Sequence, residues 1–162
     1  MYKIDNIDYE IVNMLMEDGR MRAAEIARRL GNKSERAVRY RIERMIENNV
    51  IRLSAIVNPK GLGMNVVADC WLEVEADSIQ DVAKIIAEFE NVSYVACSIG
   101  ETDISVQVMA TDTSEVYKLV TEVIGKIPGV RKTTTSIVPL VLKDVFQWRI
   151  PRSLINAERK ED

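Results

Sequence analysis

The chain has 162 residues, of which 47% are hydrophobic and 29% are charged, a balance typical of globular proteins that bury a core. This length favours a small domain joined to a second compact domain. The formal net charge is -3 and histidine is absent, which removes the commonest general base and the commonest transition-metal ligand and so disfavours an enzyme.

Enzyme and membrane signatures are also missing from the sequence. It contains no Ser-His-Asp set, Cys-His pair, P-loop or GxGxxG motif, and we expect no cofactor and no metal. Cys70 and Cys97 lie in apolar runs without CxxC spacing, which favours buried thiols over a metal site or a disulfide. No signal peptide or membrane-spanning run is recognisable, so we expect a cytoplasmic protein with no membrane partner.

The first predicted element is a helix, because apolar residues recur at helical spacing between Ile4 and Met16. Asp5 or Asn6 can cap its start, and Gly19 follows its end. We expect this helix to pack on the next two.

A second, shorter helix is predicted over residues 22–30, with Gly31 as its stop, and a third lies within residues 32–49. The residues of the second helix that face inward are Ala24, Ile26, Ala27 and Leu30. A short helix, a tight turn containing Gly and a longer helix form the helix-turn-helix pattern, whose second helix enters the DNA major groove. We therefore expect a three-helix head that binds double-stranded DNA.

The third helix has an apolar face and a basic face. Asn32 or Ser34 can cap its start, and Glu35 stands three residues after Asn32, as in a capping box. The apolar stripe consists of Val38, Ile42, Met45 and Ile46. The opposite face carries Arg36, Tyr40 and Arg44, flanked by Arg39 and Arg41. A solvated basic face without a partner is the alternative for this helix taken alone.

Positive charge is concentrated in the same part of the chain. Between Arg20 and Arg52 there are ten Lys or Arg residues and four Glu, a local balance of +6 in a chain whose net charge is -3. A basic field confined to one segment indicates contact with nucleic acid.

The β-branched run 50–57 predicts a strand after the third helix, and the turn-forming residues 58–63 break it. We place the domain boundary here. The predicted organisation is a helix-turn-helix domain over 1–50, a connecting strand and hinge over 51–63, a sensing and oligomerisation domain over 64–142, and a C-terminal tail over 143–162.

Two similar halves fill the second domain, each in the order strand, helix, strand. They are predicted as 64–74, 79–89 and 92–99, then 103–110, 116–127 and 130–141. The repeat predicts an α+β fold, a ferredoxin-like βαββαβ domain with an antiparallel sheet and both helices on one face. The apolar stripes of the helices are Ile79, Val82, Ile85, Ile86 and Phe89, and Val116, Leu119, Val120, Val123, Ile124 and Ile127.

The first strand of this domain has an apolar face and a mixed face. The apolar residues Val66, Ala68, Cys70, Leu72 and Val74 alternate with Val67, Asp69, Trp71 and Glu73. A Trp on the mixed face indicates that another subunit covers it.

The C-terminal tail begins with apolar residues and then turns polar. We expect its anchors to dock on a domain or a partner, and the last few residues to be disordered. The anchors are Val145, Phe146, Trp148 and Ile150.

Taken together, these segments resemble the Lrp/AsnC, or feast/famine, family of bacterial and archaeal transcription regulators over residues 4 to about 142. The residues that carry the resemblance are Asp5-x-x-Asp8, Ile11, Leu15, Asp18-Gly19-Arg20, Glu25-Ile26-Ala27, Val38-Arg39-Tyr40-Arg41-Ile42, Val50-Ile51, the hinge from Asn58-Pro59 to Gly63, Gly100-x-x-Asp103, Gly129-Val130 and Thr133 to Ser136. The chain departs from the family at Arg22, where a Ser or Thr cap is frequent, and at Thr102, where relatives often have an aromatic residue.

The resemblance implies a sequence-specific DNA-binding transcription regulator that forms homodimers, often assembled further into tetramers or octamers. It also implies a small-molecule effector, commonly an amino acid, bound between dimers. The effector-binding candidates are Gly100, Thr102, Asp103, Thr134 and Ser136. A reading without a ligand stays open, in which the glycine serves a hairpin turn and the aspartate caps it.

The predicted DNA contacts fall into two classes, and a dimer is expected to set two recognition helices roughly 34 Å apart, one turn of DNA. Base edges are assigned to Glu35, Arg36, Arg39 and Tyr40, at the end that Ser34 begins. Phosphates are assigned to Arg28, Arg29, Lys33, Arg41, Arg44 and Arg52.

Two other functional classes stay open. A small subfamily that resembles these regulators acts as siroheme decarboxylase, for which histidines near the tetrapyrrole are expected. The second class is a helix-turn-helix scaffold that contacts proteins and not DNA.

Overall fold

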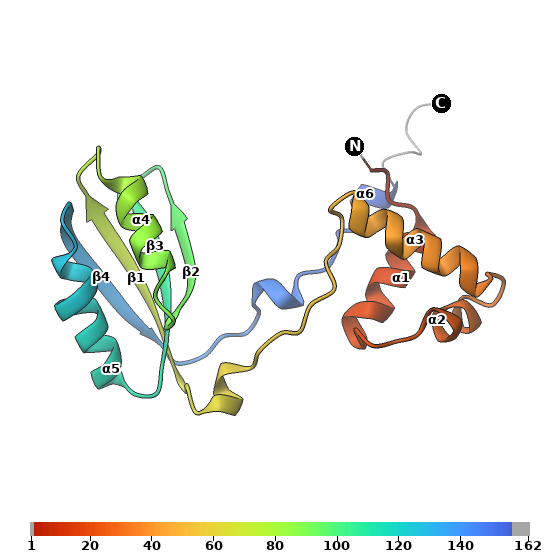
Figure 1. The fold of residues 1–162 in the computed structure, drawn as a ribbon, viewed down its shortest axis with the longest axis horizontal. Coiled ribbons are helices and arrows are strands. Elements are labelled where there is room, and N and C mark those ends of the chain that lie inside the picture. The colour runs from red at the N-terminus through yellow and green to blue at the C-terminus, as the bar shows by residue number, and fades with distance from the viewer. Residues whose placement is uncertain (1, 157–162) are drawn as a thin grey trace. The chain divides into compact units, whose positions relative to one another are not determined.

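The computed structural model describes residues 2–156 and divides the chain into two compact units (Figure 1). The first unit, the head, consists of the residues up to Ile56 together with a segment that begins at Lys143. The second unit spans Val57–Leu142. Each unit has a hydrophobic core of its own.

Three helices form the head: α1 (Asn6–Glu17), α2 (Ala23–Leu30) and α3 (Glu35–Glu47). Asp5 caps α1 in a reciprocal capping box with Asp8. The cap of α3 is Ser34, whose hydroxyl accepts a hydrogen bond from the backbone N–H of Ala37 at 3.2 Å. The predicted capping box between Asn32 and Glu35 is therefore wrong, because Glu35 is the first residue of the helix.

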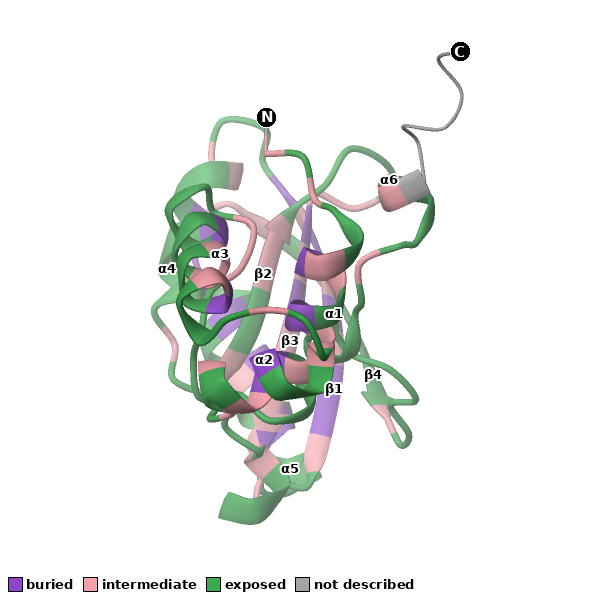
Figure 2. Cartoon of the chain, turned by 90° about the vertical axis from the view of Figure 1, so that its right-hand side faces the viewer, coloured by how far each residue is buried: buried purple, intermediate pink, exposed green. Residues whose placement is uncertain are grey.

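The core of the head comes from the facing sides of these helices (Figure 2). Its buried residues are Ile11, Val12, Leu15, Ile26, Ala27, Val38 and Met45. Two inward assignments are corrected: Ala24 is exposed and Ala23 packs on the core in its place, and Ile46 is 41% exposed. Both residues lie at the border of an apolar stripe. Successive residues of a helix are rotated by about 100°, so neighbouring positions at such a border can face either the core or the solvent.

The predicted strand over residues 50–57 is absent from the described chain. Val50 and Ile51 pack on the head core, whereas Leu53 and Ile56 are exposed and residues 51–58 have no regular structure. A strand needs a hydrogen-bonded neighbour, and the sheet of this chain lies entirely in the second unit.

The second unit begins with a short 3-10 helix, η1 (Pro59–Leu62), and then forms a four-stranded antiparallel sheet. Its strands are β1 (Val66–Val74), β2 (Val92–Cys97), β3 (Ile104–Ala110) and β4 (Val130–Val138), in the spatial order β2-β3-β1-β4. Helix α4 (Ile79–Ala87) follows β1, and α5 (Thr113–Lys118) follows β3. This is the predicted α+β, ferredoxin-like arrangement.

One face of this sheet carries the core. The alternation predicted for β1 is confirmed from Ala68 to Val74 but not at the start of the strand, where Val67 is buried and Val66 is only partly buried. Ala68, Cys70, Leu72 and Val74 pack together with Val82 and Ile86 of α4 and Val116 and Val120 of the second helical segment. The other face of β1 presents Asp69, Trp71 and Glu73, all partly exposed. Both helices therefore cover the same face and leave the mixed face open.

The second predicted helix is interrupted. After α5 the chain forms a π-helical turn, η2 (Leu119–Val123), and a 3-10 turn, η3 (Ile124–Lys126). The predicted apolar stripe is nevertheless kept, since Val116, Val120, Ile124 and Ile127 are buried, whereas Val123 at its border is 44% exposed. In α4, Ile85 at the border of the stripe is 45% exposed.

Gly129 is required where β4 begins. Its φ is 93°, and a Cβ at this position would lie 2.6 Å from the Cβ of Ser78 at the start of α4. The carbonyl of Gly129 also accepts a hydrogen bond from the backbone N–H of Glu75 at 2.8 Å. Only glycine permits this close approach of two turns.

The C-terminal segment contains η4 (Val145–Gln147) and α6 (Ser153–Asn156) and packs on α1. Ile150 contacts the head core, and the Arg149 guanidinium donates to Asn13 Oδ1 at 3.1 Å. The Arg152 guanidinium lies 5.4 Å from the centroid of the Tyr9 ring. Docking of Ile150 agrees with the expectation, whereas Val145, Phe146 and Trp148 are exposed in this chain. The expected terminal disorder concerns residues outside the described range.

None of the helices described in residues 2–156 has the length and apolar character that spanning a bilayer requires.

We predict that Ile150→Ala lowers the free energy of unfolding of the head by about 1 kcal/mol, because a half-buried apolar side chain is lost from its core. Urea unfolding combined with hydrogen exchange of the α1 amides measures this effect. Leu154→Ala, at a position 61% exposed, is the matched control. Equal unfolding of the two variants would contradict the docking.

Candidate functional site

The N-terminal half of α3 presents its polar side chains outward. Arg36, Arg39 and Tyr40 are exposed, Tyr40 at 58%. Ser34 satisfies one free backbone N–H at this end of the helix. The preceding turn starts at Gly31, whose φ of 79° ends α2. The turn and the caps therefore fix which residues stand at the exposed tip of α3.

Three of the predicted contact residues are unpaired among the described residues, and two of them, Lys33 and Arg36, lie at this tip. Among residues 2–156, the side chains of Lys33, Arg36 and Arg52 have no hydrogen bond or ion pair. A cationic side chain without an internal partner keeps all its donors for an external anion or base edge.

Other predicted contact residues are paired within their own helices. The Arg28 guanidinium binds Glu25 through Nε at 3.0 Å and Nη2 at 2.7 Å, and Arg29 Nε binds the same carboxylate at 2.9 Å. Arg39 pairs with Glu35 one turn away. All of these arginines remain exposed, so the pairs restrain them and do not remove them from the surface.

Arg41 points into the head and not toward solvent. Its Nη1 donates to Asp8 Oδ1 at 2.7 Å and to Asp5 Oδ2 at 2.8 Å. Asp8 is 2% exposed. Burial acts to raise the pKa of Asp5, but hydrogen bonds from the Asp8 backbone N–H and from Arg41 outweigh it and lower that pKa. We therefore assign Arg41 to the internal structure of the head, in place of the phosphate contact predicted from the sequence.

Arg44 has a third kind of environment. Its guanidinium carbon lies 5.5 Å from the ring centroid of Tyr2 and 5.8 Å from that of Tyr40. Tyr2 donates a hydrogen bond from its hydroxyl to Asp8 Oδ2 at 3.0 Å. Sequence reasoning missed Tyr2, although the Asp5-x-x-Asp8 spacing was a signal for Asp8, the carboxylate to which Tyr2 donates.

The effector candidates fall on two separate parts of the sheet. Gly100, Thr102 and Asp103 belong to the connection between β2 and β3. Thr134 and Ser136 are exposed on β4, opposite Trp71 and Asp69 of β1 in register. A single strand, β1, lies between the two groups, and Asp103 is hydrogen-bonded to it.

Asp103 already has an internal role. Its Oδ2 accepts a hydrogen bond from the Val74 backbone N–H at 2.8 Å, and its own N–H donates to the Leu72 carbonyl at 2.9 Å. The carboxylate thus closes the end of β1, whereas the reading without a ligand assigned it to the hairpin turn. Thr102 accepts a hydrogen bond at its carbonyl from Ser98 Oγ at 2.8 Å.

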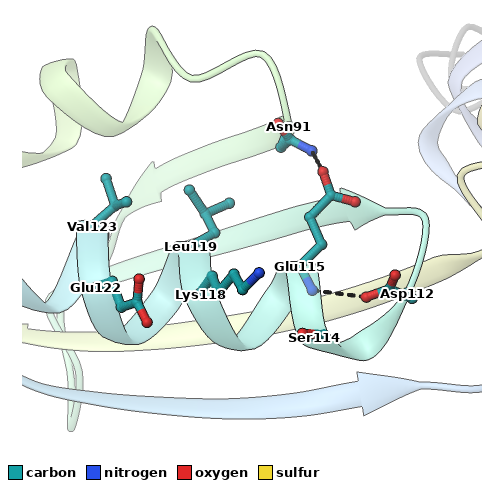
Figure 3. A pocket seen from close by; sticks show the side chains of 8 residues that line it. All are labelled: Asn91, Asp112, Ser114, Glu115, Lys118, Leu119, Glu122 and Val123. Atoms are coloured by element: carbon teal, nitrogen blue, oxygen red, sulfur yellow. Dashed lines mark hydrogen bonds between the residues drawn. The ribbon is translucent and has the colours of Figure 1, made fainter.

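A shallow cavity of about 350 Å³ lies elsewhere, along α5 and η2 (Figure 3). Figure 3 shows Glu115 joined to Asn91 and, through its backbone N–H, to the carboxylate of Asp112. The lining residues are Asn91, Asp112, Ser114, Glu115, Lys118, Leu119, Glu122 and Val123. None of the five effector candidates is among them.

The two thiols differ in exposure. Cys70 is buried, and this burial raises the pKa of its thiol. Cys97 is exposed on the edge strand β2, so the expectation that both thiols are buried is wrong for Cys97.

Two family models match the chain: an AsnC-type helix-turn-helix domain over residues 4–46 and an Lrp/AsnC ligand-binding domain over residues 68–146. An uncharacterised helix-turn-helix transcriptional regulator of Pyrococcus furiosus is 36% identical over 141 residues, which cover 86% of this chain and 95% of the relative. The chain belongs to the Lrp/AsnC family of transcription regulators. The transcriptional regulator LrpA of Pyrococcus horikoshii is 34% identical over 141 residues, 86% of this chain and 99% of the relative.

Solved structures of this family share the fold. AsnC of E. coli superposes with a TM-score of 0.82 at 25% identity, covering 90% of this chain and 99% of that one. A regulator of Neisseria meningitidis, solved as a complex with L-Met, also gives 0.82, at 21% identity, with 91% of this chain and 96% of that one covered. The chain is thus a regulator with a helix-turn-helix DNA-binding domain and an Lrp/AsnC-type ligand-binding domain.

We predict that the Glu25 ion pairs stabilise α2 at neutral pH and fail in acid. Hydrogen bonds from Arg28 and then Arg29 lower the pKa of Glu25 from 4.5 to about 2. Because the folded-state pKa lies below the unfolded one, the stabilisation is complete above pH 4.5 and is lost as the pH falls toward 2. Glu25→Gln should therefore lower Tm at neutral pH, and the difference from wild type should vanish in acid.

Thermal unfolding followed by circular dichroism across this pH range measures the difference. Glu17→Gln is the control, since Glu17 is exposed and makes no ion pair among the described residues. A Tm difference between wild type and Glu25→Gln that stays constant at every pH would contradict the assignment.

Proposed function

We propose that this regulator binds a pseudo-palindromic DNA site as a homodimer, that the exposed tip of α3 reads base edges, and that a small molecule such as an amino acid modulates the complex. One observation carries the proposal: Arg36 and Tyr40 stand exposed on the first two turns of α3, and Arg36 has no partner among the described residues. In helix-turn-helix proteins the N-terminal residues of the second helix contact base edges.

The contacts divide by chemistry. Arg36 is suited to a guanine, because a free guanidinium can donate two hydrogen bonds to O6 and N7. Tyr40, Arg39 and Glu35 lie on the same exposed tip, with Arg39 oriented by Glu35. Phosphate contacts are assigned to Arg28, Arg29, Lys33, Arg44 and Arg52, which position the head without reading sequence.

A homodimer fits the open face of the sheet. Trp71 lies on this face beside Asp69 and Glu73 and is only partly buried, and a bulky aromatic on an unpaired sheet face is typical of a subunit contact. We propose that two such faces pair by a twofold axis and that the dimer binds DNA with its two α3 helices one turn apart, roughly 34 Å. Tetramers or octamers then bring several heads to one stretch of DNA.

The effector is proposed to bind between dimers at residues from different parts of the sheet. The candidates remain Gly100, Thr102, Asp103, Thr134 and Ser136. Only β1 lies between the two groups within one chain, so a second dimer that packs across this strand would contact both. An effector at such a contact favours one assembly over another and changes how many heads engage DNA.

Enzyme and scaffold functions are less well supported. The curated relatives are named transcriptional regulators, and the chain has no histidine to serve a tetrapyrrole. A scaffold function that involves only protein contacts does not explain why cations at the tip of α3 are unpaired.

We predict that Arg36→Ala and Lys33→Ala affect DNA binding differently. Arg36→Ala should reduce discrimination between a cognate site and a mutated site by about 1–3 kcal/mol, because a bidentate base contact is lost. Lys33→Ala should weaken all sites similarly and reduce the slope of log K against log salt by about one. Fluorescence titrations of both variants at several salt concentrations, on the DNA upstream of its own gene and on random DNA, measure these effects.

Arg131→Ala is the control, since Arg131 is exposed on β4 in the other unit. If the Arg36 and Lys33 variants lose affinity and discrimination in the same way, the division between base and phosphate contacts is refuted. Wild-type protein without sequence preference at any salt concentration would refute the proposed function itself.

We predict that an effector shifts the assembly equilibrium of the regulator. Sedimentation velocity with and without a panel of amino acids should show a change in oligomer size for at least one of them; L-Met is included because a structural neighbour was solved with it. Thr134→Val, which removes an exposed hydroxyl on β4, should weaken the response, whereas Thr121→Val on η2 should leave it intact. An unchanged distribution with every amino acid would remove this part of the proposal.

A further inference from the structure

Arg44 lies near two aromatic rings, one of which lies outside the helix-turn-helix segment. Tyr40 stands one turn earlier on α3, and its ring centroid is 5.8 Å from the Arg44 guanidinium carbon. Tyr2 precedes α1, and its ring centroid is 5.5 Å away. A guanidinium within about 6 Å of a ring centroid is attracted by the ring electrons. The N-terminal segment therefore contacts the recognition helix through its tyrosine ring.

The ring contacts leave the N–H donors of Arg44 without a hydrogen-bond partner among the described residues. Among residues 2–156 its side chain makes the two ring contacts but no hydrogen bond and no ion pair. A guanidinium stacks through its planar faces, and its N–H donors lie around the edge. Its charge and donors are thus available to an anion, unlike those of Arg41, which two carboxylates occupy.

Tyr2 is itself fixed by a buried acceptor. Its hydroxyl donates to Asp8 Oδ2 at 3.0 Å, and Asp8 is 2% exposed. Asp8 also accepts from Arg41 Nη1 at 2.7 Å. Burial and, next, the hydrogen bond to Asp8 raise the pKa of Tyr2, so the phenol remains a donor at neutral pH. Tyr2 is therefore tied to the core of the head while its ring faces Arg44.

We infer that Tyr2 is a positioning residue for DNA binding, which holds the Arg44 guanidinium beside Tyr40 with its N–H edge free for a DNA phosphate. The inference rests on the proposed function, since it needs α3 to face DNA. A restrained arginine loses less side-chain freedom when it binds a phosphate than a free one does. Tyr2 then adds to affinity without touching DNA.

A double-mutant cycle tests this inference, with Tyr2→Ala, Arg44→Ala and the double variant titrated against DNA at several salt concentrations. Tyr2→Ala should weaken binding by about two- to five-fold, the range of an exposed cation–π contact. Arg44→Ala should weaken binding and reduce the salt slope by about one, as for a lost phosphate contact. In the Arg44→Ala background, Tyr2→Ala should have no further effect on affinity.

Two further variants separate the ring from the hydroxyl and from general loss of structure. Tyr2→Phe keeps the ring and loses the hydrogen bond to Asp8, so its DNA affinity should stay close to wild type even where its Tm falls. Tyr117→Ala removes a tyrosine that is 65% exposed in the other unit and should change nothing. Thermal unfolding of each variant confirms that the titrated protein is folded.

The outcomes distinguish the inference from the proposed function. Suppose that wild-type protein binds DNA and that Tyr2→Ala lowers DNA affinity equally in the wild-type and Arg44→Ala proteins. Tyr2 then acts through the stability of the head, which overturns the inference but leaves the proposed function standing. Equal losses for Tyr2→Phe and Tyr2→Ala also overturn it, because the hydroxyl and not the ring is then responsible. If wild-type protein has no salt-sensitive DNA affinity, the inference and the proposed function fall together.

Discussion

The arrangement of the head depends on one buried carboxylate. Asp8 is almost fully inaccessible to solvent, and a buried charge is costly unless it is paired and hydrogen-bonded. Arg41 from α3 supplies the opposite charge, while the hydroxyl of Tyr2 and the backbone N–H of Asp5 supply further donors. These partners come from three places in the chain, so satisfying this carboxylate ties α1, α3 and the N-terminal segment into one geometry.

The same interaction explains how the basic residues of α3 divide their roles. Arg41 and Arg44 stand three positions apart on one helix, yet one faces α1 and is neutralised there, while the other stacks on rings and stays available. Arg36, at the exposed tip, has no internal partner among the described residues. The arginines of α3 thus differ in how far they are engaged inside the head, and we propose that Arg36 and Arg44 contact DNA.

Much of the fold can be predicted from the sequence, because the spacing of apolar residues indicates which face of each helix or strand is buried. Alternation in β1 and the stripe in α4 are enough to place a sheet and its covering helix. The stripe of the second helix is also predicted correctly at Val116, Val120, Ile124 and Ile127, which are buried. The π turn within it is not predicted, because no residue type indicates such a turn. The roles of Arg41 and Tyr2 depend on partners far away in the chain, which the periodicity of the sequence cannot reveal. The segment 50–57 forms no strand because a strand needs a neighbouring strand with which to form hydrogen bonds.

The C-terminal segment makes the head discontinuous in sequence. Ile150 completes a core whose other residues all precede Arg52, so the ligand-binding unit is topologically an insertion between two parts of the head. Docking of this segment on the head closes a loop that contains the whole second unit. The entropy lost on closing this loop depends on whether the second unit is folded, because the folded unit holds its own two ends at a fixed separation. Unfolding of the ligand-binding unit therefore weakens the head as well, which couples the stabilities of the two units thermodynamically even without a shared surface.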